Sequence, residues 1–194
     1  MKTWAAMVLI LVSAGTADAA KKSLSQEETV TVCMGTPIPG VPAAQSVASG
    51  MFAKIGVRIH WVKYGNCVPE AIRITFQTLN DVGPEPEALA YALPYQGRDI
   101  VVLYGRIRRF GKDLETNLLA HVLTHEITHI LQGVARHSEA GVMKASWTYD
   151  DHTLMLHNKP LPFTALDTAL IHAGIDSRTA RAGINRLAAR ARVP

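Results

Sequence analysis

The chain has 194 residues, of which 48% are hydrophobic and 19% are charged, and its formal net charge is +4. This length is sufficient for one domain with a sizeable core. The basic run of Arg106, Arg108 and Arg109 lacks the interleaved aromatic residues of a nucleic-acid surface. We therefore expect a solvated loop there and no nucleic-acid partner.

Residues 1–19 are typical of a secretory signal peptide. Lys2 lies in a short basic start, an apolar run extends from Trp4 to Val12, and Ala17-Asp18-Ala19 has the pattern of a cleavage site. The apolar run is shorter than the roughly 20 residues that span a bilayer, which disfavours the alternative of an uncleaved anchor. We expect a secreted or periplasmic monomer in which residues 20–194 form one domain without a transmembrane segment.

The chain has two cysteines, Cys33 and Cys67. An oxidising compartment favours a disulfide bond between them. Such a bond stabilises a domain by about 3–4 kcal/mol, because it restricts the unfolded chain. In the alternative, Cys33 binds a metal ion and keeps an enzyme latent, but a paired cysteine cannot coordinate.

Residues 28–77 have the pattern of three strands and one helix. Val30 and Val32 alternate with threonines, as in a half-buried strand. A cluster of prolines then prevents regular structure until a helix begins near Pro42 or Ala43, and Gly56 ends this helix. The predicted strands are Glu28–Met34, Val57–Trp61 and Ala71–Gln77.

Residues 80–88 are expected to form an irregular loop, because they are rich in proline and glycine. Glu85 and Glu87 lie in this loop. Two acids without a calcium-loop pattern are better explained as solvated side chains than as calcium ligands. A short apolar strand is predicted next, over Ile100–Tyr104.

A long helix is predicted from Asp113 to Gln132. Leu114, Leu118, Val122 and Ile130 recur at helical spacing and would form one buried stripe. Gly133 is the natural end of the helix, because glycine readily adopts the left-handed conformation found just after helices.

This helix carries the pattern H-E-x-x-H as His125, Glu126 and His129. Residues at i and i+4 share a helix face, so both imidazoles point in the same direction. Two imidazoles in this arrangement can occupy two positions of a tetrahedral zinc ion, with the glutamate as the base that accepts a proton from water. The chemistry indicated is hydrolysis, most simply of a peptide bond.

A catalytic zinc ion needs a third protein ligand, and His121, His137 and His152 compete for this role. His121 is eight residues from His129, or about 12 Å along a helix, so one ion cannot bind both. We interpret His121 as a packing residue or as one that supports a metal ligand. The third ligand must come from chain that has turned back after Gly133, and His137 is the first candidate able to do so.

The C-terminal region, 148–194, is predicted to be helical. A short helix is expected over Thr153–Leu156, a second from Pro162 to His172 ended by Gly174, and a third over Ser177–Arg192. The third helix carries five arginines around Ile184 and Leu187: Arg178, Arg181, Arg186, Arg190 and Arg192. We expect a solvated helix face that packs a modest apolar stripe on the domain, with an anionic envelope or acidic partner as the alternative.

The zinc helix and the residues after it resemble the metzincin metallopeptidases, whose pattern is H-E-x-x-H-x-x-G-x-x-H followed by a methionine turn. His125, Glu126 and His129 match directly, and Gly141-Val142-Met143 is similar to that turn. The spacing differs, because Gln132 takes the place of the glycine. The resemblance implies His137 as third ligand and Met143 beneath the metal. His152, His157 and Glu139 remain the alternative ligands.

The resemblance extends upstream, over roughly residues 43–147, to the strands of matrixin-like catalytic domains. It implies an α+β fold. Residues 28–147 would form a twisted mixed sheet that packs on an N-terminal helix and on the helix of His125 and His129, and residues 148–194 would form the helical C-terminal part. The strand Leu89–Leu93 would be the sheet edge along which substrate lies. Many matrixins have a histidine of a second, structural zinc where this chain has Tyr91, so one catalytic zinc ion is expected.

These features predict a secreted zinc-dependent endopeptidase, with peptide or protein as substrate. Zinc would be held by His125, His129 and His137, and Glu126 would be the general base. The alternative is a metal-binding envelope module that keeps the metzincin fold without catalysis, which the altered spacing after His129 favours. In a third reading, H-E-x-x-H occurs by chance and the histidines are ordinary helix residues.

Overall fold

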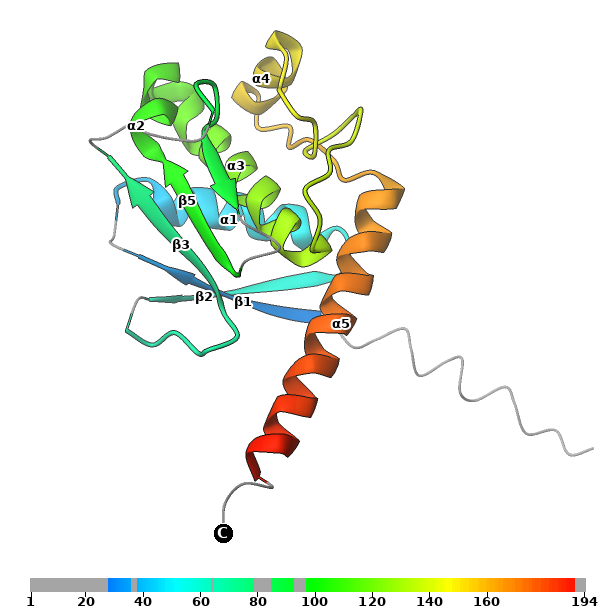
Figure 1. Cartoon of the computed structure of the whole chain (residues 1–194). Coiled ribbons are helices and arrows are strands. Elements are labelled where there is room, and N and C mark those ends of the chain that lie inside the picture. The colour runs from blue at the N-terminus through cyan, green and yellow to red at the C-terminus, as the bar shows by residue number, and fades with distance from the viewer. Residues whose placement is uncertain (1–27, 36–37, 64, 79–84, 93–96, 191–194) are drawn as a thin grey trace, which may run out of the picture.

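The computed structural model describes residues 28–35, 38–63, 65–78, 85–92 and 97–190 (Figure 1). The predicted signal peptide and its cleavage site lie outside these residues. The elements, in chain order, are β1 (Glu28–Met34), α1 (Val41–Ala53), β2 (Val57–Lys63), β3 (Ile72–Gln77), β4 (Ala90–Ala92), β5 (Asp99–Leu103), α2 (Tyr104–Ile107), the short 3-10 helix η1 (Arg108–Phe110), α3 (Lys112–Gln132), α4 (Tyr149–Leu156) and α5 (Ala165–Arg190).

The described strands form one mixed sheet in the order β2-β1-β3-β5-β4. β1, β2, β3 and β5 run parallel, and β4 pairs with β5 in the antiparallel direction. The prediction of a mixed sheet is confirmed, and β4, which lies within the predicted strand Leu89–Leu93, is at an edge of that sheet.

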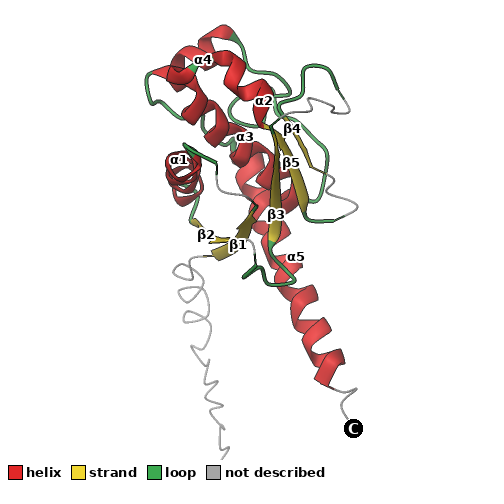
Figure 2. Ribbon diagram, turned by 90° about the vertical axis from the view of Figure 1, so that its left-hand side faces the viewer, coloured by secondary structure: helices red, strands yellow, loops and turns green. Residues whose placement is uncertain are grey.

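The core lies between the sheet and helices α1 and α3, which cover the same face of the sheet (Figure 2). Apolar side chains at alternate strand positions are buried, such as Ile72 and Ile74 in β3. α1 packs against α3, and Phe52 near the end of α1 is fully buried. α3 therefore has buried residues on almost every side, and its position is fixed by the core.

The predicted disulfide bond is present between Cys33 and Cys67, whose Cα atoms are 5.6 Å apart. It joins the end of β1 to the loop after β2. Among the described helices, even the long α3 and α5 fall short of the apolar length that crossing a bilayer requires.

The predicted bounds of α1 and α3 differ from the observed bounds by only a few residues, and Gly133 adopts the expected left-handed conformation with φ 68°. α4 begins at Tyr149, four residues before the predicted start at Thr153. The reason is a capping box, in which the side chains of Thr148 and Asp151 each accept a hydrogen bond from the other's backbone N–H.

The prediction of two C-terminal helices separated at Gly174 is wrong, because α5 is continuous from Ala165 to Arg190. Gly174 instead allows close packing: a Cβ atom added there would lie 1.7 Å from the carbonyl oxygen of Leu131, in the last turn of α3. The predicted apolar stripe also does not pack on the domain. Ile184 and Leu187 are 65% and 68% exposed, on the half of α5 that extends away from the sheet (Figure 1).

Gly174→Ala is expected to destabilise the domain by roughly 2–3 kcal/mol, because the added methyl group forces α5 away from α3. The matched control is Gly183→Ala in the same helix, where an added Cβ meets nothing within 4 Å. That change is expected to stabilise by roughly 0.5–1 kcal/mol through helix propensity. Urea unfolding measures both. Equal stability of Gly174→Ala and the wild type would contradict the packing role.

Candidate metal centre

The last three turns of α3 place His125, Glu126 and His129 in the interior. Their exposures are 8%, 8% and 7%, and the i, i+4 spacing directs both imidazoles to the same side. The helix is held by core residues on its other faces, among them the fully buried Ile127. The three side chains therefore have little freedom to rearrange.

Backbone carbonyls orient both helix imidazoles. His125 Nδ1 is 2.9 Å from the Val142 carbonyl oxygen, and His129 Nδ1 is 3.2 Å from the Val134 carbonyl oxygen. A carbonyl only accepts, so Nδ1 carries the proton on both rings and Nε2 presents a lone pair. This is the tautomer of a metal ligand whose outer nitrogen is held by the protein.

The chain turns back after Gly133 and brings His137 to the two helix histidines. The His137 ring centroid is 5.3 Å from that of His125 and 5.1 Å from that of His129. One ligand atom from each ring lies within 4.8 Å of the others. Because His137 is exposed whereas the other two are buried, the cluster is open on its side.

The donor set fits a cation. The Nε2 atoms of His125 and His129 are 3.0 Å apart, so two lone pairs face each other in a buried place. Burial lowers the pKa of His125 to about 3, with the nearby His129 adding to the effect, and burial lowers the pKa of His129 to about 4. Both rings are neutral at pH 7, and a shared metal ion would relieve the opposed lone pairs.

Glu126 lies beside His125 in the sequence, and its side chain is buried. Burial raises the pKa of its carboxyl group to about 8. A nearby cation favours the ionised form and would lower that pKa. The carboxyl group is thus suited to exchange a proton near neutral pH once a metal ion is bound.

The predicted methionine turn lies next to the histidine cluster, because the Val142 carbonyl oxygen accepts a hydrogen bond from His125. Met143 is fully buried, and its carbonyl oxygen accepts a hydrogen bond of 2.7 Å from Ser138 N–H. Val142 N–H donates to the carbonyl oxygen of Pro162 at 2.9 Å. Gly141 has φ 77°, and a Cβ there would lie 2.2 Å from that same oxygen, so the turn requires glycine. Trp147 packs on the His125 ring in a T-shaped arrangement, with 5.9 Å between the ring centroids.

The alternative ligands lie outside the cluster of described residues. His121 is a packing residue, as expected: its Nδ1–H donates to the Asn117 carbonyl oxygen at 2.6 Å, and its Nε2 accepts from Leu161 N–H at 3.0 Å. His152 packs on Phe110 instead. The two remaining alternatives, His157 and Glu139, are exposed.

Asp167 ties the loop of His137 to α5, and sequence reasoning missed it. Its carboxylate is completely buried and accepts hydrogen bonds from Arg136 at 2.7 Å, Ser138 at 2.7 Å and the Thr164 hydroxyl at 2.7 Å. Arg136 and Ser138 flank His137 on both sides. Although burial alone would raise it, the pKa of Asp167 is lowered, because these groups stabilise the carboxylate.

Part of this arrangement had a signal in the sequence. Thr164 and Asp167 have the T-x-x-D spacing of a capping box, and each accepts from the other's backbone N–H at 3.1 Å. No local pattern connects Arg136 to an acid 31 residues away.

The fold is similar to that of archaemetzincin from Methanopyrus kandleri, whose crystal structure matches with a TM-score of 0.58 at 14% sequence identity. The match covers 79% of this chain and 99% of that one. No family model and no curated protein sequence matches the chain. The likeness supports the metzincin part of the fold prediction, and the closer resemblance to matrixins stays a prediction.

Asp167→Ala is expected to weaken zinc binding by roughly 10–100-fold, because Arg136 and Ser138 lose the carboxylate that holds the His137 loop. The control is Asp176→Ala, which removes an exposed carboxylate from the same helix. Competition with a chromogenic chelator measures the affinity, and circular dichroism at the assay temperature verifies folding. Zinc affinity equal to that of the wild type in folded Asp167→Ala would refute the role.

Proposed function

We propose that the chain is an exported zinc-dependent endopeptidase of metzincin type. The single observation that carries the proposal is the convergence of His125, His129 and His137 beside the buried carboxyl group of Glu126. Three imidazoles with one open side are the donor set of a catalytic zinc site rather than of a closed structural one. The archaemetzincin-like fold gives independent support.

His125, His129 and His137 would hold the ion. A zinc ion there supplies Lewis-acid polarisation of a substrate carbonyl and acidifies water. Glu126 accepts the proton of the attacking water and passes it to the nitrogen of the leaving amine. The Val142 and Val134 carbonyls keep both helix imidazoles in the tautomer that offers Nε2. The burial of the Glu126 side chain would strengthen its interaction with charge that develops nearby.

The peptide substrate would lie along β4. This strand is at the sheet edge, and it contacts α3, which carries the site. An extended peptide can add to such an edge through main-chain hydrogen bonds, with specificity left to side-chain pockets. Export to an oxidising compartment is part of the proposal, and the Cys33–Cys67 bond is compatible with it.

A second candidate is a metal-binding module of the cell envelope that lacks protease activity. The observation in its favour is the longer spacing between His129 and His137, together with the exposure of His137. Chelator-sensitive turnover of a broad peptide library by the zinc-loaded protein would exclude this candidate. A zinc-loaded protein that cleaves no peptide would favour it.

Glu126→Gln is expected to lower kcat by roughly 10²–10⁴-fold with zinc still bound, because the amide cannot accept the proton of water. Glu139→Gln is the matched control, since it makes the same change at an exposed acid of the loop beside the site. Cleavage of a library-derived fluorogenic peptide measures the rate, and elemental analysis measures the zinc. A Glu126→Gln protein as active as the wild type would eliminate the proposed base.

Reconstituted protein is expected to contain one zinc ion per chain. His137→Ala should weaken zinc binding by at least about 100-fold, because it removes one of three ligands. His157→Ala removes an exposed imidazole of α4's C-terminal end and should leave zinc binding unchanged. Tight stoichiometric binding by His137→Ala would assign the third ligand elsewhere.

A further inference from the structure

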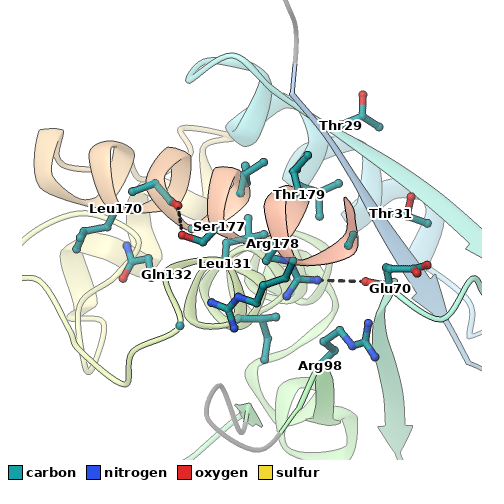
Figure 3. A pocket seen from close by; sticks show the side chains of 18 of the residues that line it. Thr29, Thr31, Glu70, Arg98, Leu131, Gln132, Leu170, Ser177, Arg178 and Thr179 are labelled. Atoms are coloured by element: carbon teal, nitrogen blue, oxygen red, sulfur yellow. Dashed lines mark hydrogen bonds between the residues drawn. The ribbon is translucent and has the colours of Figure 1, made fainter. Parts of the chain in front are cut away.

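A concave site that none of the three histidines lines lies between α5 and the end of the sheet where the parallel strands begin (Figure 3). It has a volume of about 770 Å³. Its polar lining includes three arginines and one glutamate: Arg98, Arg178, Arg181 and Glu70. Thr29, Thr31 and Thr179 also line it.

The topology explains why these residues meet. β1, β3 and β5 are parallel, so their N-terminal ends lie at the same end of the sheet. The pocket is lined by the start of β1, by Glu70 just before β3 and by Arg98 just before β5. α5 passes this edge because Gly174 packs against the end of α3, and the next turns of α5 bring Arg178 and Arg181 to the pocket.

The positive charge of this pocket is not neutralised within the described chain. Arg178 donates to the main-chain carbonyl oxygen of Glu70 at 3.2 Å and leaves the Glu70 carboxylate unused. Asp99, next to Arg98, is held at both oxygens by Arg73, at 2.6 and 2.8 Å. Among the residues described, Arg98, Arg178 and Arg181 form no ion pair.

The arginines repel each other across the pocket. Burial lowers the pKa of Arg178, and the positive charges of Arg98 and Arg181 lower it further. Three guanidinium groups against one exposed carboxylate leave an excess of two positive charges. Such an excess around a concave site attracts and concentrates anions.

We propose that this pocket binds a phosphoryl group, either of a soluble phosphate ester or of a lipid headgroup. Guanidinium groups bind phosphate through paired N–H···O hydrogen bonds, and a phosphoryl group offers three oxygens where a single carboxylate offers two. Three arginines therefore match phosphate better than carboxylate. The site is independent of the metal centre, although the last turn of α3 contributes Leu131 and Gln132 to its wall.

Calorimetric titration of the purified, disulfide-bonded protein with inorganic pyrophosphate tests the proposal. The double variant Arg98→Gln/Arg181→Gln should bind at least about tenfold more weakly, because two charged hydrogen-bond donors are lost. Neither side chain makes a hydrogen bond or ion pair within the described chain, so folding should be retained. The matched control is Arg108→Gln/Arg109→Gln, two exposed arginines near the far end of α3, which should bind as the wild type does.

Sedimentation with vesicles identifies the source of the phosphoryl group. Binding to phosphatidylglycerol but not to phosphatidylcholine vesicles, lost in Arg98→Gln/Arg181→Gln, assigns the site to a lipid headgroup. Pyrophosphate binding without vesicle binding assigns it to a soluble ester. Absence of pyrophosphate binding at millimolar concentration, or equal weakening in the two double variants, would overturn the proposal. The variant Arg98→Gln/Arg181→Gln leaves the three histidines intact, so its loss of binding separates this pocket from the metal centre and from the proposed peptidase activity.

Discussion

The buried carboxylate of Asp167 is the interaction on which the candidate metal centre depends most. It has no exposed surface, and it bonds to side chains on both sides of His137. A buried ion pair contributes little net stability, because desolvation offsets the attraction, but removing one partner leaves an uncompensated charge. Its effect is to select one conformation of the loop, the one in which the third imidazole faces the other two.

The close contact of α3 and α5 gives Asp167 its place. Because Gly174 has no side chain, the backbone of α5 can lie directly against the Leu131 carbonyl group of α3. Asp167 lies seven residues before Gly174 in α5 and bonds to the loop after α3. Arg178 lies one helical turn after Gly174 and bonds to the Glu70 carbonyl oxygen, just before β3. One helix crossing thus organises both the histidine cluster and the cationic pocket.

The sequence predicted those helices and strands that depend on interactions between residues close together in the chain. The helix that carries His125 and His129, its end at Gly133 and the strands were evident because periodicity, glycine and β-branched residues act over a few positions. Gly174 was misread as a helix stop, since the sequence does not distinguish a glycine that ends a helix from one that permits a close crossing. The Arg136 partner and the pocket arginines depend on residues brought together only by the tertiary fold.

The altered spacing after His129 has a structural account in two parts. Relative to the metzincin pattern, the glycine comes one residue later, so α3 continues through Gln132 before the left-handed turn at Gly133. Three residues instead of two then separate the glycine from His137. The longer loop is held twice: the Val134 carbonyl binds His129 Nδ1, and Arg136 binds Asp167. One extra residue adds little to the entropy cost of closing a loop, and these bonds fix the path of the loop. His137 therefore lies in the cluster although it comes two residues later than in the metzincin pattern.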